Sequence, residues 1–202
     1  LIHLVKKAFL GKCPLPLVHI DTTYKIPEMI PWRDAYVKKY SLRLLVGQNK
    51  AAIEAGMNWG EGRIACCTAL KTQALLNAAV EHKIQGLMLG IRGDEDGSRG
   101  KERIVSPRLE GASWNYKNQL AELWHYYNLH LPPDVHIRIH PLLRWTELDV
   151  WEYILQENIE VIPLYFAREG KRYRSIGCAP CTGTMRSDAS SVREIVEELQ
   201  GI

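Results

Sequence analysis

The sequence lacks the features of a membrane or secreted protein. No apolar run approaches the roughly 20 residues that a helix needs to cross a bilayer, so we do not expect membrane association. The opening segment 1–9 is amphipathic but has no signal-peptide cleavage site. Because this helical pattern starts without a capping residue, we expect native sequence upstream of Leu1. Together these absences predict a cytoplasmic protein.

The chain also lacks a strong charge imbalance, internal repeats and low-complexity tracts. Its net charge is only +3 over 202 residues, which does not by itself indicate a nucleic-acid partner. Basic residues gather only around 92–108 and 168–174, where they could equally serve a polyphosphate ligand. The histidines show no metal-binding spacing. The apolar share of 46% and the charged share of 24% are ordinary for a globular protein.

Alternating strand and helix patterns predict an α/β fold. Short apolar segments typical of buried strands alternate along the chain with amphipathic segments typical of helices. We expect strands at 15–20, 42–46, 86–91 and 136–140, and helices at 1–9, 27–40, 67–82, 146–157 and 191–199. This order indicates βαβ units and a mostly parallel sheet with helices on both faces. We divide the chain into a nucleotide-binding α/β domain, 1–167, and a C-terminal segment with a cysteine motif and a helix, 168–202.

A loop dense in charge follows the strand predicted at 86–91. Residues 92–103 contain four acidic and four basic side chains. Ligands bind beyond the carboxyl ends of parallel strands, which places this loop and Asp21-Thr22 at one rim of the sheet. Arginine and lysine bind phosphate oxygens strongly, while a carboxylate can hold Mg²⁺ or buttress a guanidinium. We predict a polyphosphate site; the alternative is a solvated loop whose charges pair with one another.

The loop and the segments after it resemble a known family. Residues 92–103, 114–128, 145–154 and 163–165 are similar to segments of the small, ATP-cleaving subunit of bacterial sulfate adenylyltransferase. That subunit belongs to a superfamily that also contains the adenylyl-sulfate and phosphoadenylyl-sulfate reductases. The resemblance covers nearly the whole chain and implies the adenine-nucleotide α-hydrolase-like fold of the PP-loop ATPases.

The resemblance implies an enzyme that cleaves ATP between its α and β phosphates. Sulfate and ATP would give adenylyl sulfate and pyrophosphate, with a partner GTPase subunit driving this uphill step. Asp21 and Thr22 would lie near the nucleotide. The residues implied near the phosphates and the incoming oxyanion are Arg92, Asp94, Arg99, Lys101 and Arg103. With Mg²⁺, these cations would offset the negative charge that builds up in the transition state.

The phosphate-binding loop of the family is not in this sequence. The resemblance implies a serine-glycine-glycine-x-aspartate-serine loop that holds the leaving pyrophosphate at a helix N-terminus. In relatives this loop lies just before a helix similar to residues 1–9, so we expect it in sequence upstream of Leu1.

Four of the five cysteines form a second constellation, Cys66-Cys67 and Cys178-x-x-Cys181. Four thiolates can bind a [4Fe–4S] cluster or a structural zinc, although adjacent cysteines are a poor clamp for zinc. The metal-free alternatives are buried small side chains or a redox pair. The arrangement resembles the iron–sulfur adenylyl-sulfate reductases, which implies a [4Fe–4S] cluster on all four cysteines. Adenylyltransferase small subunits lack these cysteines, so the sequence combines features of both groups.

Other functions stay open. The cysteines also fit an iron–sulfur ATP pyrophosphatase that activates a nucleic acid for sulfur insertion, by DNA phosphorothioation or tRNA thiolation, with a cysteine desulfurase partner. A reductase needs a nucleophilic cysteine in its C-terminal tail, and no cysteine follows Cys181 in this sequence. The non-enzymatic alternative is a degenerate domain that binds nucleotide and scaffolds a complex.

Overall fold

The chain folds into two compact units. The computed structural model describes residues 1–108, 114–124, 126–127 and 136–201. The charged-loop unit comprises Leu1 and Ala79–Tyr153, and the cysteine unit comprises Ile2–Ala78 and Ile154–Ile202. No helix among the described residues has the length and apolar character required to cross a membrane.

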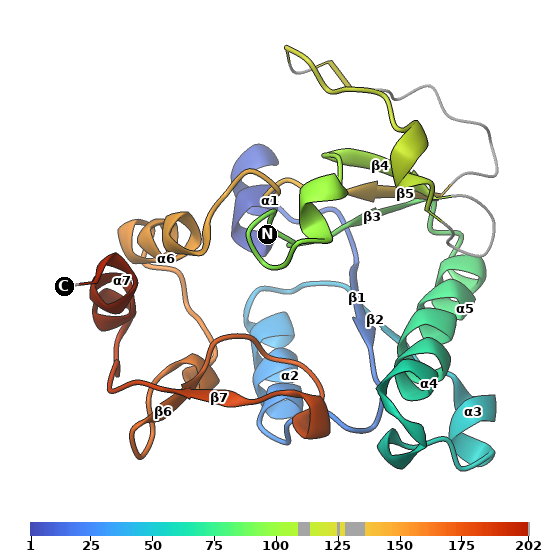
Figure 1. Cartoon of the computed structure of the whole chain (residues 1–202), viewed down its shortest axis with the longest axis horizontal. Coiled ribbons are helices and arrows are strands. Elements are labelled where there is room, and N and C mark those ends of the chain that lie inside the picture. The colour runs from blue at the N-terminus through green and yellow to red at the C-terminus, as the bar shows by residue number, and fades with distance from the viewer. Residues whose placement is uncertain (109–113, 125, 128–135, 202) are drawn as a thin grey trace. The chain divides into compact units, whose positions relative to one another are not determined.

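Helices and strands alternate through both units (Figure 1). The α-helices of the described residues are α1 (Ile2–Ala8), α2 (Met29–Lys39), α3 (Lys50–Glu54), α4 (Arg63–Cys67), α5 (Gln73–Glu81), α6 (Glu147–Gln156) and α7 (Val192–Gln200). The strands are β1 (Leu17–Ile20), β2 (Leu44–Gly47), β3 (Gly86–Met88), β4 (Val105–Arg108), β5 (His136–Ile139), β6 (Lys171–Tyr173) and β7 (Thr184–Arg186).

A parallel strand pair forms the centre of the cysteine unit. β1 and β2 pair in register from Leu17 opposite Leu44 to Ile20 opposite Gly47, and α2 provides the crossover that a parallel pair requires. At Gly47 a side chain would collide with α5, because its Cβ would lie 2.9 Å from the Cβ of Ala78. Glycine therefore sets how closely this helix packs on the strand pair.

Apolar side chains from distant parts of the sequence complete the core of the same unit. Ile26, Ile162 and Leu164 are all buried, and partly buried aromatic and aliphatic side chains pack against them. Nearby, β6 and β7 form an antiparallel hairpin. Burying apolar area from both ends of the chain stabilises the return of residues 154–201 to the N-terminal part.

One helical stretch in the cysteine unit changes its winding. α4 leads directly into a π-helical turn, Thr68–Thr72, and then into α5. Leu70, Ala74 and Ala78 are buried along this stretch. Single π-helical turns inside α-helices are rare and often occur at functional sites.

The charged-loop unit contains a three-stranded sheet. Its strand order is β3-β5-β4, with β3 parallel and β4 antiparallel to β5. Helix α6 follows and begins with a reciprocal cap: the Thr146 backbone N–H donates to Asp149 at 2.7 Å, and the Asp149 backbone N–H donates to Thr146 Oγ1 at 3.1 Å. This is the capping pattern expected at the predicted helix start.

The predicted strands and helices are all present, together with three elements that were not predicted: helix α3, strand β4 and the β6–β7 hairpin. β4 lies inside the segment expected to be a loop after β3. The helix expected at 67–82 starts earlier, at Arg63, and contains the π-helical turn. The division of the chain at residue 167 stays a prediction. Each of the two compact units is built from separate stretches of sequence.

Candidate functional site

The charged loop folds onto the start of α6. Arg92 Nε donates to Asp94 Oδ1 at 2.8 Å, and Asp94 Oδ2 accepts the Glu147 backbone N–H at 2.8 Å. Arg92 also lies 3.6 Å from the Glu95 carboxylate and 4.0 Å from that of Glu147. Asp94 therefore buttresses a guanidinium and caps the first turn of α6, where a negative charge is favourable.

The remaining predicted phosphate-binding cations also have partners within the chain. Arg99 Nε or Nη1 lies 3.7–3.9 Å from the carboxylates of Glu95, Asp96 and Glu102. Lys101 Nζ sits 4.5 Å from the centre of the Tyr116 ring, and Arg103 Nε donates to the Leu120 carbonyl at 3.3 Å. A phosphate ligand would have to replace some of these partners. The role of the loop in binding ATP stays a prediction.

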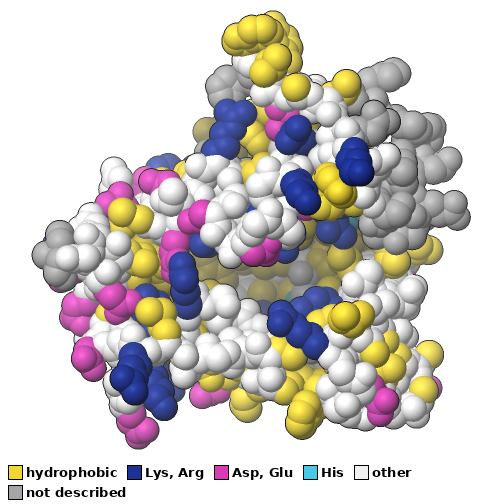
Figure 2. All heavy atoms as spheres, in the orientation of Figure 1, with side chains coloured by type: hydrophobic (Ala, Val, Ile, Leu, Met, Phe, Trp, Pro, Cys, Tyr) yellow, Lys and Arg dark blue, Asp and Glu magenta, His cyan; other side chains and the backbone are white. Residues whose placement is uncertain are grey.

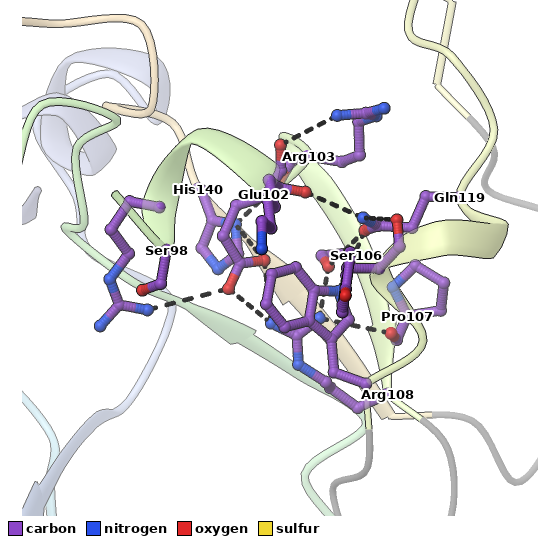
Figure 3. A network of polar contacts seen from close by, with 12 residues as sticks. Ser98, Glu102, Arg103, Ser106, Pro107, Arg108, Gln119 and His140 are labelled. Carbon is purple, nitrogen blue, oxygen red and sulfur yellow. Dashed lines mark hydrogen bonds and ion pairs between the residues drawn. The ribbon is translucent and has the colours of Figure 1, made fainter. Parts of the chain in front are cut away.

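A buried polar network lies between the loop and the sheet (Figure 3). Arg108 Nη2 lies 2.8 and 2.9 Å from the two oxygens of Glu102, and these side chains are only 2% and 3% exposed. Arg108 also donates to Ser106 and stacks on the Trp114 ring, 4.8 Å from its centre. His140 is fully buried with its Nδ1 3.9 Å from Glu102. The sequence analysis did not identify this network.

The segment 114–124 presents polar groups inward and apolar groups outward. Glu122 accepts the backbone N–H groups of Ile104 and Val105, each at 2.8 Å, and so ties the segment to the start of β4. Hydrophobic side chains, yellow at the top of Figure 2, project from the same segment. The most exposed are Leu120, Leu123 and Trp124 at 69%, 57% and 83%.

The two predicted nucleotide-binding residues follow β1 and point to different groups. Asp21 accepts hydrogen bonds from Gln48 Nε2 and from the Thr23 backbone N–H, both at 2.8 Å. Thr22 is 2% exposed, and its Oγ1 lies 3.1 Å from Cys178 Sγ. Thr22 thus belongs to the surroundings of the cysteines in this structure.

The four cysteines of the two motifs line one pocket within the cysteine unit. Cys66 and Cys67 are the last residues of α4. Cys178 precedes a short 3-10 turn, Ala179–Cys181, and Cys181 is its last residue. The Ala179 backbone N–H fixes this turn by donating to the Tyr24 carbonyl at 2.7 Å. Thiols 112 positions apart along the chain are therefore brought together, as predicted for a shared ligand set.

The electrostatics of this pocket depend on which thiols are ionised. All four cysteines are free. Burial raises the pKa of the Cys66 thiol, and repulsion from the Cys67 thiolate raises it further. Burial lowers the pKa of the Lys25 ammonium, whereas attraction to Cys178 opposes that change. Among the described residues, no three histidine, cysteine or carboxylate side chains are arranged as a closed site for one metal ion.

Three side chains of the pocket wall were missed from the sequence, Tyr24, Trp59 and Lys71. Lys71 follows Cys67 by four positions, a helical spacing that could have indicated their proximity. Trp59 lies in a separate 3-10 turn, Trp59–Glu61, and no spacing rule connects it with the cysteines.

Comparison with known proteins agrees on one family. The model of the phosphoadenosine phosphosulfate reductase domain matches residues 1–184. Sulfate adenylyltransferase subunit 2 of Parabacteroides distasonis is 40% identical over 230 aligned positions, which cover 98% of this chain and 76% of the relative. The protein of the same name from Methylobacterium radiotolerans is 42% identical over 229 positions, covering 98% and 72%.

Solved structures agree on the fold. The phosphoadenylyl-sulfate reductase of Candida auris, in a phosphate complex, matches with a TM-score of 0.60 at 18% identity, over 90% of this chain and 76% of that one. FMN adenylyltransferase of Candida glabrata, bound to FMN and an ATP analogue, matches with a TM-score of 0.54 at 17% identity, over 88% and 48%. These likenesses confirm the predicted α/β fold class.

Proposed function

This chain belongs to the phosphoadenosine phosphosulfate reductase domain family, and from its relatives within it we propose that it transfers the adenylyl group of ATP to sulfate. The observation that carries the proposal is the 40% identity to a sulfate adenylyltransferase subunit 2 over 98% of the chain. The family resemblance predicted from the sequence motifs is thereby confirmed.

In the proposed reaction a sulfate oxygen attacks the α-phosphorus of ATP. The bond from that phosphorus to the oxygen bridging it to the β-phosphorus breaks, and pyrophosphate leaves with the electron pair. Sulfate is already an anion, so no general base has to remove a proton. The main task of the protein is to position both anions and to offset their charge.

We assign that task to the cations of the charged loop. Arg92, Arg99, Lys101 and Arg103 would exchange carboxylate, aromatic or carbonyl partners for phosphate and sulfate oxygens. Asp94 would hold Arg92 and the α6 N-terminus in place. Mg²⁺ would arrive with ATP as part of the substrate.

We propose that the cysteine pocket binds a [4Fe–4S] cluster. The support is that four free thiols line one pocket, with Lys71 in its wall to balance their negative charge. Cys66, Cys67, Cys178 and Cys181 would hold the cluster. When bound, it would cross-link the end of α4 to the turn before β7, two segments far apart in sequence.

We also propose a larger partner subunit. The relatives are designated subunit 2 of their enzyme. Forming the mixed anhydride of sulfate and AMP is strongly uphill, and the family resemblance implies a GTPase partner that supplies the missing free energy. The alternative partner, a cysteine desulfurase, belongs to the sulfur-insertion function that the four cysteines also fit.

Pyrophosphate release tests the proposal. We expect the protein, purified without oxygen together with its partner subunit, to release pyrophosphate from ATP at a rate that rises with sulfate concentration. Arg99→Ala should reduce that rate by about 10- to 100-fold, since it removes a charge-assisted contact. Arg144→Ala, which removes an exposed charge from the same unit, should leave the rate of pyrophosphate release unchanged. Pyrophosphate release that does not depend on the sulfate concentration but requires a nucleic acid would contradict adenylyl transfer to sulfate and support the sulfur-insertion function.

A further inference from the structure

One face of the sheet in the charged-loop unit is polar although it is largely buried. Pairing between β4 and β5 puts Ser106 opposite Arg138 and Arg108 opposite His136. Paired residues point to the same face, and alternate residues along a strand share it, so His140 also belongs to this side. Ser106, Arg108 and His140 are at most 2% exposed.

The charges on this polar face are not balanced. Among the described residues, Glu102 is the carboxylate buried beside it, and Arg108 already binds both of its oxygens. The Nε of Arg138 is buried and has no hydrogen-bond partner among the described residues. Burial lowers the pKa of Arg138 and repulsion from Arg108 adds to this effect, whereas attraction to Glu102 opposes it. Both oxygens of Glu102 already bind Arg108, so a further anion is expected to be favourable beside Arg138.

The histidines beside Arg138 also have ring nitrogens without a partner. His140 is completely buried, with Nδ1 2.7 Å from the Arg103 carbonyl and with no partner for Nε2 in the described part of the chain. Both ring nitrogens of His136 are buried and lack partners there as well. A buried polar group without a hydrogen-bond partner destabilises the fold, so the unpartnered nitrogens of Arg138 and His136 on one face indicate that a ligand completes them.

We propose that Arg138, with His136 beside it on the same face of β5, forms a binding site for a small tetrahedral oxyanion. In the reaction proposed above, on which this assignment rests, the oxyanion is the substrate sulfate. A guanidinium supplies paired donors to two oxygens, and the neutral imidazole of His136 can supply one more. The Nδ1–H of His140 donates to the Arg103 carbonyl, so a neutral His140 has no N–H left for the anion. Glu102 would hold Arg108 away from the ligand, which leaves Arg138 as the binding cation. A phosphate group of ATP has the same chemistry, and the kinetics below separate the two sources.

Sulfate binding can be measured without turnover. We expect sodium sulfate to raise the Tm of the protein more than sodium chloride of equal ionic strength, in the absence of ATP. Arg138→Gln should abolish this difference, and Arg138→Lys, which keeps the charge but loses the paired donors, should reduce it. Arg144→Gln is the matched control and should retain it. A sulfate effect that is absent from the unmodified protein, or that persists in Arg138→Gln, would overturn the site.

Steady-state kinetics then identify the ligand. Arg138→Gln should raise the KM for sulfate by about 10- to 100-fold and leave the KM for ATP nearly unchanged. A rise confined to the KM for ATP would assign the same site to a phosphate group of ATP and overturn the sulfate assignment. If sulfate stabilises the unmodified protein through Arg138 but never stimulates pyrophosphate release, the anion site stands and the proposed adenylyltransferase activity fails.

Discussion

Cys178 is the most firmly positioned thiol of the cysteine pocket. Its sulfur lies 3.1 Å from Thr22 Oγ1, and its carbonyl accepts the Thr182 hydroxyl at 2.8 Å. Its backbone pairs with that of Lys25 in an isolated β-bridge. Contacts on both the side chain and the backbone fix the direction of the sulfur, and fixed direction is what a cluster ligand requires.

The cysteine pocket leads to a prediction about single residues. Protein purified without oxygen should be brown, with visible absorbance from a [4Fe–4S] cluster, and Cys178→Ser should remove most of it because one of four ligands is lost. Cys13→Ser is the matched control, since the Cys13 thiol donates to the Leu15 carbonyl at 3.6 Å and does not line the cysteine pocket. Iron and sulfide analysis with visible spectroscopy measures both variants. A colourless unmodified protein would refute the cluster.

Individual site residues were predictable to different degrees. The four cysteines could be assigned to one site because their side-chain chemistry restricts what they bind, whatever their distance in sequence. The buried pair of Glu102 and Arg108 could not, because charged residues within a polar loop look solvated until tertiary packing buries them. Arg138 carried a weak indication: it alternates with two histidines in a strand, so three polar side chains share one face.

At the scale of elements, local pattern was enough for most helices and strands. The exceptions have specific causes. β4 contains Pro107, which argues against a strand, yet β4 lies at the edge of the β3-β5-β4 sheet, where a missing N–H is tolerated. β6 and β7 have three residues each, which is too short for a periodic pattern. The π-helical turn depends on packing on both sides of it and has no signature in sequence.

The cap of α7 supports a prediction about an element. Ser191 Oγ accepts the Glu194 backbone N–H at 3.3 Å, and the helix buries Ile195 and Val196. Ser191→Ala should lower the free energy of unfolding by about 1 kcal/mol and Tm by about 2–4 °C. Thermal unfolding followed by circular dichroism measures the change. Ser175→Ala, at an exposed position, is the control, and equal Tm values for the two variants would contradict the role of the cap.

At the scale of the whole molecule, the fold class was predictable and the division into units was not. Repeated alternation of strands and helices restricts the chain to α/β architectures. In contrast, the charged-loop unit takes Leu1 and a central stretch, while the cysteine unit joins residues from both ends of the chain. The division depends on which apolar faces pack against each other in the folded chain. Periodicity along the sequence does not show which faces will be partners.

Binding of the nucleotide should stabilise the molecule as a whole. At about 100 times its dissociation constant, Mg-ATP should add about 2.7 kcal/mol to the free energy of unfolding and raise Tm by roughly 5–10 °C. Differential scanning fluorimetry at constant ionic strength measures the shift, with MgCl₂ alone as the control. A shift of the same size with MgCl₂ alone would mean that the metal, and not the nucleotide, binds the folded protein.

The π-helical turn Thr68–Thr72 sets the rotation of α4 about the helix axis relative to α5. Each residue of a regular α-helix advances the side chains by about 100°, and a π-helical turn holds an additional residue. Removing one residue from this turn would rotate the thiols of α4 by about that angle relative to Ala74 and Ala78. The additional residue thus lets one helical stretch meet two separate requirements. α5 packs against the β1–β2 pair, while α4 directs Cys66 and Cys67 into the cysteine pocket.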